Sequence, residues 1–554
     1  MSAGWAAVGQ VGLVVLVLAV AHRPLGDHLY RTMTSTRHLA VERMGYRLMR
    51  VDPDADQRWS TYLLSLLGFS LASVLLLFGL ARLQDRLPLG IGMAAMDPAG
   101  AWNTAVSFVT NTNWQWYSGE AAAGHLVQMT GLAVQNFVSA AVGLAVAAAL
   151  GRGLSRAGHG ARVGNFWADL VRGTVRVLLP LALVAAVVLV AAGVVQNLHG
   201  PTDVTTLTGG TQSVLGGPVA SQEAIKQLGT NGGGFFNANS AHPYENPTPW
   251  SNAFAVVLML LIPFSIPRMY GRMVGDRRQG WAVLAAMSTI WVAAVGLLTW
   301  AELRGPGLAP IAAAGALEGK EVRFGEAASA LFAASTTMTS TGATNSTHDS
   351  LTAPGGGVAL VGMLLGEVSP GGVGSGLYGM VVLVILAVFL AGLMVGRTPE
   401  YLGKKIGKQE ITLVALYVLT MPAVVLVGSA VAISTSAGLA GQLQGGPHGL
   451  TEVVYAFASA GNNNGSAFGG LASGTSFYTV ALGLAMLLGR FVPIALVLAL
   501  AGRFAQQGRS APGAGTLPTH SPLFVGLLVT VTLVVVGLTF VPVLSLGPVV
   551  ESLS

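Results

Sequence analysis

Ten long apolar segments constrain the fold of this chain more than any other feature of its sequence. A helix of about 20 apolar residues crosses the roughly 30 Å of hydrocarbon in a lipid bilayer. Only 9% of the residues are charged, whereas a soluble domain carries about 25%. The sequence therefore predicts an all-α polytopic membrane protein with ten transmembrane helices. The expected spans are residues 5–21, 61–81, 124–150, 176–196, 250–272, 280–301, 356–396, 411–433, 476–500 and 522–547.

The first apolar segment ends in Ala19-Val20-Ala21, which fits the cleavage site of a secretory signal peptide. However, no Lys or Arg precedes this segment, and the chain that follows it is rich in Arg. This charge distribution is the reverse of that in a secretory signal. We therefore expect a retained span with its N-terminus outside.

The 29 lysines and arginines predict the orientation of the chain. Most of them lie in the connections after spans 1, 3, 5, 7 and 9, and cytoplasmic loops carry such an excess. The opposite connections hold only Arg82, Arg86, Lys226, Arg304, Lys320 and Arg323. Both termini are therefore expected on the extracytoplasmic side. Because the basic residues lie between spans, the net charge of +6 does not indicate nucleic acid.

Four long outer connections, after spans 2, 4, 6 and 8, share one layout: an acidic residue, a short apolar stretch and a polar cluster. The acidic residues are Asp97, Glu223, Glu326 and Glu452, and the clusters are residues 110–115, 230–234, 339–344 and 461–466. Asn113, Gly232, Gly342 and Gly465 align at intervals of 119, 110 and 123 residues. This regularity predicts four pseudo-repeats of span, pore helix, filter and span around a central pore.

The repeats divide the chain into six parts. We expect an N-terminal span and cytoplasmic loop (1–60), four pore repeats (61–150, 151–279, 280–409 and 410–503) and a C-terminal span (504–554). The third repeat contains the seventh span, which is too long for one crossing and is interrupted by a glycine-rich run at 371–376.

The composition of the clusters suits a dehydrated monovalent cation. Backbone carbonyls can replace the water around such an ion when the chain turns them toward one axis. That geometry requires positive φ at some residues, which Gly adopts at little cost and Asn tolerates next best. Thr and Ser can add hydroxyl oxygens. The alternative for any single cluster is an ordinary outer turn, but four clusters on one side favour a pore.

The apolar stretches before the clusters are predicted to be helices whose C-terminal ends point at the pore. Asp97 and Pro98 form a typical helix start. Ser221 with Glu223, and Thr451 with Glu452, are expected to begin the second and fourth helices in the same way. Acidic residues at these starts complement the helix dipole.

A few further residues are candidates for a gate or for coupling. The glycine run, with Gly372 and Gly374, could form a gate loop beneath the third filter or merely a packing kink. Glu367 lies just before it, and an intramembrane carboxylate suggests a function; the alternative is a cap for the half-helix. Arg490 lies within span 9 and either acts in the ion pathway, faces a partner subunit, or pairs with Glu367 for structure alone.

Three polar residues remain outside these assignments. Arg397 begins a basic run that can be a coupling site or an anchor on the inner side. Gln115 and Glu120 are expected in the vestibule rather than as ion ligands.

The chain resembles the KdpA family, the potassium-binding subunits of bacterial Kdp K⁺-transporting P-type ATPases. The resemblance covers nearly the whole length. It is carried by residues 110–115, 229–247 (GTNGGGFFNANSAHPYENP), 342–350, 366–380 (GEVSPGGVGSGLYGM), 396–405 (GRTPEYLGKK) and 462–468 (NNNGSAF).

The resemblance implies high-affinity binding of extracytoplasmic K⁺ in the bacterial inner membrane. It implies that a separate KdpB-like subunit hydrolyses ATP, and that KdpC-like and small KdpF-like subunits complete the complex. It places Arg397 and Arg490 in gating or coupling. The implied filter residues are Thr112, Asn113, Asn231, Gly232, Thr341, Gly342, Asn464 and Gly465.

No Walker A pattern and no Asp-Lys-Thr-Gly phosphorylation motif occurs in the sequence. We therefore expect no ATP site and no enzymatic activity in this chain alone. One alternative is a stand-alone Trk/Ktr-like K⁺ channel or ion-coupled transporter, which shares the four-fold design. Another is a membrane-embedded enzyme, which would need a cluster of His, Asp or Glu at membrane depth.

Overall fold

The computed structural model describes residues 3–304, 317–511 and 516–553. In these ranges, ten helices or continuous helical stretches are long and apolar enough to cross a membrane. They are α1 (Ala3–Met33), α3 (Trp59–Leu83), η2–α6 (Val127–Ser155), α7–η3–α8 (Phe166–Ala191), α10 (Pro249–Met273), α11 (Arg277–Arg304), α14 (Ser375–Met394), α15 (Lys408–Ile433), α18 (Ser476–Gln506) and α19–η6–α20 (Pro522–Leu553). The predicted fold class and number of spans are confirmed.

Four shorter helices precede the four polar clusters. They are α4 (Pro98–Val109), α9 (Val219–Leu228), α12 (Gly325–Met338) and α17 (Gly446–Asn462). We call them the pore helices. The remaining helical elements are α2 (Ala40–Met49), η1 (Gln84–Arg86), α5 (Gly119–Ala122), η4 (Asn239–Ala241), η5 (His348–Ser350), α13 (Ala353–Leu364) and α16 (Ser436–Leu439).

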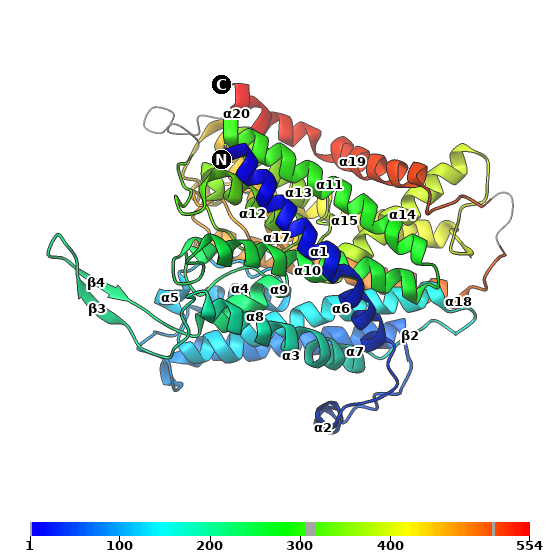
Figure 1. Cartoon of the computed structure of the whole chain (residues 1–554), viewed down its shortest axis with the longest axis horizontal. Helices are drawn as coiled ribbons and strands as arrows, with labels where there is room; N and C mark the ends of the chain where they lie inside the picture. Colours follow the sequence, from blue (N-terminus) through cyan, green and yellow to red (C-terminus); the bar gives the residue numbers. More distant parts are fainter. Residues whose placement is uncertain (1–2, 305–316, 512–515, 554) are drawn as a thin grey trace.

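The strands are short, and each described strand pairs with one other. They form the antiparallel pairs β1 (Gln57–Arg58) with β2 (Arg162–Gly164), β3 (Thr202–Thr205) with β4 (Thr211–Val214), and β5 (Glu400–Tyr401) with β6 (Lys404–Lys405). The β3–β4 hairpin extends from the end of the bundle at which the chain also begins and ends (Figure 1). Both ends of the chain therefore lie on one side of the bundle.

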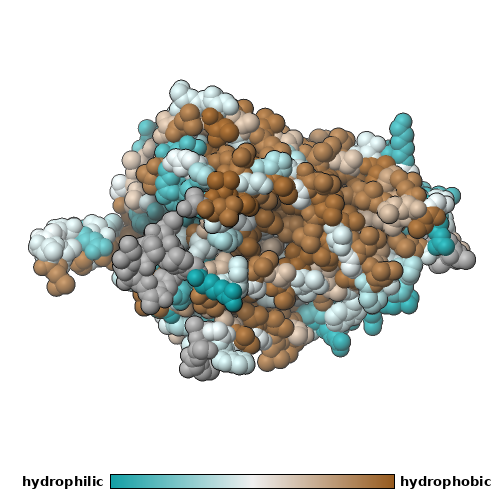
Figure 2. Space-filling view, turned by 90° about the horizontal axis from the view of Figure 1, so that it is seen from above, coloured by the Kyte–Doolittle hydropathy of each residue, from teal (hydrophilic) through white to brown (hydrophobic). Residues whose placement is uncertain are grey.

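The two spans of each repeat differ in how much of their surface is buried. In the span that follows each filter, 78%, 72%, 67% and 56% of the most apolar stretch is buried, for α6, α10, α14 and α18 respectively. The spans that precede the filters are less buried, at 22% for α3, 28% for α7–α8, 50% for α11 and 11% for α15. Four inner helices thus surround the pore, and the apolar outer helices form a broad hydrophobic surface between more hydrophilic ends (Figure 2).

The seventh span is broken, as the glycine run predicts. The helical chain stops after α13, continues as an irregular loop from 365 to 374, and resumes as α14. The predicted break at 371–376 extends too far along the chain, because Ser375 and Gly376 already belong to α14. Irregular backbone at this depth is tolerated where protein surrounds it or where it lines a cavity.

Three predicted boundaries are wrong. The fourth span begins at Phe166 rather than near 176, because Asn165 caps it by accepting a hydrogen bond from the Ala168 amide at 3.1 Å. The second pore helix begins after Pro218, so Ser221 and Glu223 lie inside it. The fourth begins at Gly446 with Pro447 in its first turn, so Thr451 and Glu452 lie inside that helix as well.

Candidate functional site

The four polar clusters share one backbone pattern. Each has two residues with positive φ, separated by one residue, directly after its pore helix, and in the second cluster Gly233 (67°) is a third. The pairs are Asn111 (69°) and Asn113 (53°), Thr230 (49°) and Gly232 (75°), Ser340 (54°) and Gly342 (71°), and Asn463 (60°) and Gly465 (105°). Non-Gly residues rarely adopt this conformation. Its fourfold recurrence shows that the clusters are structural equivalents, and we call them filters 1 to 4.

Each pore helix holds its filter through an equivalent hydrogen bond. The amide of the residue between the two positive-φ positions donates to a carbonyl five residues earlier in the chain. The bonds are Thr112 to Ser107 (3.0 Å), Asn231 to Lys226 (2.9 Å), Thr341 to Thr336 (3.2 Å) and Asn464 to Ser459 (2.8 Å). The last carbonyls of each pore helix therefore face the filter, so the negative end of the helix dipole lies close to it.

The filters contact one another in a closed ring. A Cβ atom built on Gly232 would lie 1.8 Å from the Thr341 carbonyl oxygen of filter 3. At Gly342 it would lie 2.1 Å from the Asn464 oxygen, and at Gly465 it would lie 2.0 Å from the Thr112 oxygen. Glycine is required at these positions because the carbonyl of the next filter occupies the space of a side chain.

Asn113 closes the ring in filter 1, where the equivalent residue has a side chain. Its Nδ2 atom donates to the Gly232 carbonyl of filter 2 at 3.2 Å and to Asn136 Oδ1 of α6 at 2.6 Å. The ring therefore runs through filters 1, 2, 3 and 4 in chain order. The structure brings together all eight predicted filter residues, and all but Gly465 are buried.

The glycine-rich loop of the broken span lies against the filters. The Val373 amide donates to Thr230 Oγ1 at 2.9 Å, and the Gly371 amide donates to the carbonyl of Met338, the last residue of α12, at 2.9 Å. At Gly374, where φ is 88°, a Cβ atom would lie 2.0 Å from the Gly143 carbonyl oxygen of α6. The loop that contains the predicted gate residues Gly372 and Gly374 thus contacts filter 2, the end of α12 and α6.

Glu367 belongs to the environment of filter 4. This buried residue has a φ of 49°, and its Oε1 atom accepts a hydrogen bond from Asn464 Nδ2 at 2.7 Å. This hydrogen bond therefore orients the side chain of Asn464, a predicted filter residue.

Arg490 lies in α18 and is buried. It donates to the Ser139 carbonyl of α6 at 3.0 Å, and within the part of the chain that the structure describes it forms no ion pair with Glu367. The interpretation of Arg490 and Glu367 as an ion pair is therefore wrong. Each residue instead contacts polar groups at or next to a filter.

Ser139 connects Arg490 to two filters. The Ser139 hydroxyl donates to Asn111 Oδ1 at 2.7 Å and accepts from Asn231 Nδ2 at 3.2 Å. Asn231 Nδ2 also donates to Asn111 Oδ1, at 2.6 Å. Sequence reasoning missed Ser139 and Asn136, although polar residues within an otherwise apolar span are a recognisable signal.

The remaining predicted residues have different surroundings. Arg397 is exposed in the loop after α14, away from the ring of filters. Gln115 joins filters 1 and 2, because its amide donates to the Gly234 carbonyl at 3.1 Å and its Oε1 accepts from the Gly234 amide at 2.8 Å. Glu120 accepts from the Asn237 amide at 2.9 Å.

A buried charged cluster lies next to filter 2, around Lys226 of the second pore helix. Lys226 Nζ lies 2.6 Å from a carboxylate oxygen of Glu223 and 2.6 Å from one of Glu245, and it donates to Asn239 Oδ1 at 2.9 Å. Two carboxylates share one ammonium group, and burial, followed by the nearby Glu245 charge, raises the pKa of Glu223 to about 7. Glu223 thus belongs to a buried charged cluster inside the helix and does not lie at the helix start.

Known proteins match this chain over nearly its whole length. The KdpA family, described as the potassium-transporting ATPase A subunit, matches residues 12–553. A relative from Kineococcus radiotolerans is 63% identical over 98% of each chain, and one from Clavibacter sepedonicus is 60% identical over 99% of each. Both are named potassium-transporting ATPase potassium-binding subunit.

A solved structure has a similar fold at low sequence identity. The potassium transporter TrkH from Vibrio parahaemolyticus superposes with a TM-score of 0.52 at 14% identity. The match covers 87% of this chain and 98% of TrkH. With ten membrane-spanning helices, four equivalent filters and a family match from residue 12 to residue 553, the chain belongs to the KdpA family, the potassium-binding A subunits of potassium-transporting ATPases.

Proposed function

We propose that the ring of filters binds K⁺ and that this chain supplies the ion to a separate ATP-hydrolysing subunit. The observation that carries the proposal is the alternation of positive φ in all four filters, together with the carbonyls packed against Gly232, Gly342 and Gly465. Rings of backbone carbonyls replace the hydration shell of K⁺. The proposed ligands come from Thr112, Asn113, Asn231, Gly232, Thr341, Gly342, Asn464 and Gly465.

The names of the relatives support the partner assignment. They are potassium-binding subunits of a potassium-transporting ATPase, so the phosphorylated subunit is expected to be a KdpB-like chain. KdpC-like and KdpF-like subunits are proposed to complete the complex. This chain holds no sequence motif for ATP, and we propose that it contributes no ATP site.

The proposed orientation places the mouth of the pore outside the cell. The basic residues concentrate in the loops opposite the filters, which supports an inner-membrane protein with both termini extracytoplasmic. We also propose that the four pore repeats occupy residues 61–150, 151–279, 280–409 and 410–503.

The loop containing Gly372 and Gly374 is proposed as the gate, with Glu367 and Arg490 as the groups that couple it to the filters. Its contacts with Thr230 and the end of α12 support this role, since movement of the loop would disturb filters 2 and 3. Arg397 is exposed, and we propose that it acts at the cytoplasmic end by contacting a partner subunit.

Reconstitution tests the proposed function. The complex of this chain with its ATPase partner should take up K⁺ with ATP hydrolysis and discriminate strongly against Na⁺. The chain alone should hydrolyse no ATP. Equal stimulation of the complex by Na⁺ and K⁺ would contradict the filter, and ATP hydrolysis by the isolated chain would contradict the division of roles.

A further inference from the structure

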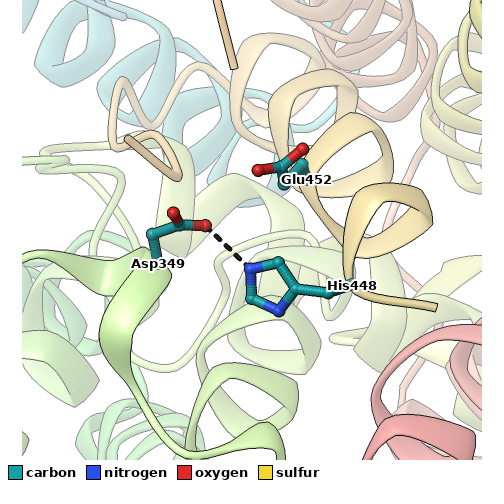
Figure 3. A group of neighbouring side chains, drawn as sticks. All are labelled: Asp349, His448 and Glu452. Carbon is teal, nitrogen blue, oxygen red and sulfur yellow. Dashed lines mark hydrogen bonds and ion pairs between the residues drawn. The ribbon is translucent and has the colours of Figure 1, made fainter. Parts of the chain in front are cut away.

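A cluster of three metal-ligating side chains lies beside the fourth pore helix, outside the filters. It consists of Asp349, in the short helix η5, and His448 and Glu452, which are one turn apart on α17 (Figure 3). Residues four positions apart lie on the same face of a helix. One donor atom from each of the three side chains lies within 4.8 Å of the others.

The two carboxylates and the imidazole surround one small space. Asp349 Oδ1 lies 3.0 Å from His448 Nε2. Ligand atoms around tetrahedral Zn²⁺, at bond lengths of about 2.0–2.2 Å, are about 3.3 Å apart. A Cβ atom built on Gly470 would lie 2.0 Å from Glu452 Oε1 and 3.1 Å from Asp349 Oδ2, so both carboxylates face the space beside this glycine.

Glu452 supplies an independent sign that the cluster binds a ligand. Its exposed fraction is 0%, and within the described residues neither of its carboxylate oxygens is hydrogen-bonded to a side chain or paired with a cationic group. Burying a carboxylate without a partner is costly. A cation held between Glu452, Asp349 and His448 would remove that cost.

A fourth side chain, that of Glu551, contacts the imidazole of His448 from outside the cluster of three. Glu551 of α20 lies with Oε1 2.7 Å from His448 Nδ1, the ring nitrogen that faces away from Asp349. Histidines that ligate metals usually donate their other N–H to a carboxylate, which fixes the tautomer and orients the ring. In the structure Nε2 is hydrogen-bonded to Asp349 Oδ1, and a bound metal would replace this contact with ligation by both atoms.

From this geometry we propose that Asp349, His448 and Glu452 form a binding site for a divalent transition metal of the Zn²⁺ type. Imidazole suits Zn²⁺ and other first-row transition metals, whereas K⁺, Mg²⁺ and Ca²⁺ prefer oxygen ligands alone. The site is separate from the filters. Its metal joins the pore helix of filter 4 to the segment after filter 3, and through Glu551 to the C-terminal helix.

Zn²⁺ binding to the assembled complex tests the proposal. The detergent-purified complex is stripped with a chelator, dialysed against Zn²⁺ and assayed for bound metal by mass spectrometry. The wild-type complex should bind one equivalent through this site, and the Co²⁺-substituted complex should show the visible absorption of a His- and carboxylate-ligated ion. Glu452→Gln should remove that equivalent, and Glu551→Gln should weaken its binding 10- to 100-fold.

Two further variants make the result specific. Gly470→Ala retains all three ligand residues, but its added methyl group would lie 2.0 Å from Glu452 Oε1 and must displace that carboxylate, so it should also abolish binding. Asp203→Asn, on the exposed β3–β4 hairpin, removes a carboxylate elsewhere and should bind Zn²⁺ like the wild type. The proposal is overturned if the wild-type complex binds no Zn²⁺, or if Glu452→Gln and Gly470→Ala bind it as the wild type does. In either case the cluster would consist of a protonated His448 paired with Asp349 and Glu551, and it would not be a metal site.

Discussion

Arg490 is a single buried charge that reaches the proposed ion site through another residue. Its guanidinium donates to the Ser139 carbonyl, and the Ser139 hydroxyl contacts both Asn111 and Asn231. A buried guanidinium in a span is costly and is usually retained for a function. We infer that Arg490 acts through α6 on filters 1 and 2.

Replacing Arg490 by Met should preserve membrane insertion and assembly but lower K⁺-stimulated transport by the complex at least 10-fold. The reason is that α6 loses the charge that fixes Ser139 between the two filters. Uptake by proteoliposomes measures the effect. The control is Arg503→Met, which removes the ion pair with Glu410 at the C-terminal end of the same helix. Normal pumping by Arg490→Met would show that the residue is only structural.

Glu223 predicts a pH dependence of stability. Its pKa is raised from about 4.5 to about 7 in the folded protein, mainly by burial. The folded state therefore binds the proton more tightly, so this contribution to stability is complete below pH 4.5 and is lost as the pH rises through 7. The wild-type melting temperature should fall between pH 5 and pH 8.

Glu223→Gln serves as the test of that effect. A neutral amide keeps the shape of the side chain and leaves Lys226 paired with Glu245. The variant should lose less stability than the wild type over the same pH range. Parallel pH profiles for the two proteins would mean that Glu223 is already ionised without cost.

At the scale of single elements, the filters were predictable because their chemistry is local. Gly and Asn at equivalent positions indicate positive φ, and the structure has positive φ at Asn113, Gly232, Gly342 and Gly465. The starts of two pore helices were not predictable from their acidic residues, because the proline-containing turns at Pro218 and Pro447 begin those helices earlier. Long-range contacts such as Arg490 with Ser139 left no local signal.

The broken span gives a prediction at the same scale. Gly374→Ala would place a Cβ atom 2.0 Å from the Gly143 carbonyl oxygen, at a φ of 88°. The loop would then move away from α6, at a cost of about 1–3 kcal/mol from the backbone conformation alone. We expect a lower melting temperature and impaired transport. Gly366→Ala, with a φ of 78° but no atom closer than 4.0 Å, should be milder. If the two variants lost stability and transport equally, backbone strain alone would explain the effect, and the contact of Gly374 with Gly143 would not contribute.

For the whole molecule, the fold follows from the difference between inner and outer spans. The sequence could predict ten spans from their apolar length, but not which spans surround the pore, since all are similarly hydrophobic. That arrangement depends on which helix follows a filter, as the burial of α6, α10, α14 and α18 shows.

The orientation of the molecule is testable by reporter fusions. A reporter active only in the periplasm should function after Ser554 and fail when inserted at Gly158, in the exposed turn before β2. The reason is the concentration of basic residues in the loops on the Gly158 side. The opposite pattern would place the filters in the cytoplasm.

Equilibrium K⁺ binding by the Gly232→Ala variant examines the ring of filters itself. The added methyl group would lie 1.8 Å from the Thr341 carbonyl oxygen, so that carbonyl must move. A cost of about 1–3 kcal/mol corresponds to K⁺ binding that is about 5- to 150-fold weaker, with reduced preference over Na⁺. Gly92→Ala, at a similar φ of 81° but in open space, should bind K⁺ like the wild type. Wild-type affinity and selectivity in Gly232→Ala would mean that the four clusters are ordinary turns and not an ion-binding ring.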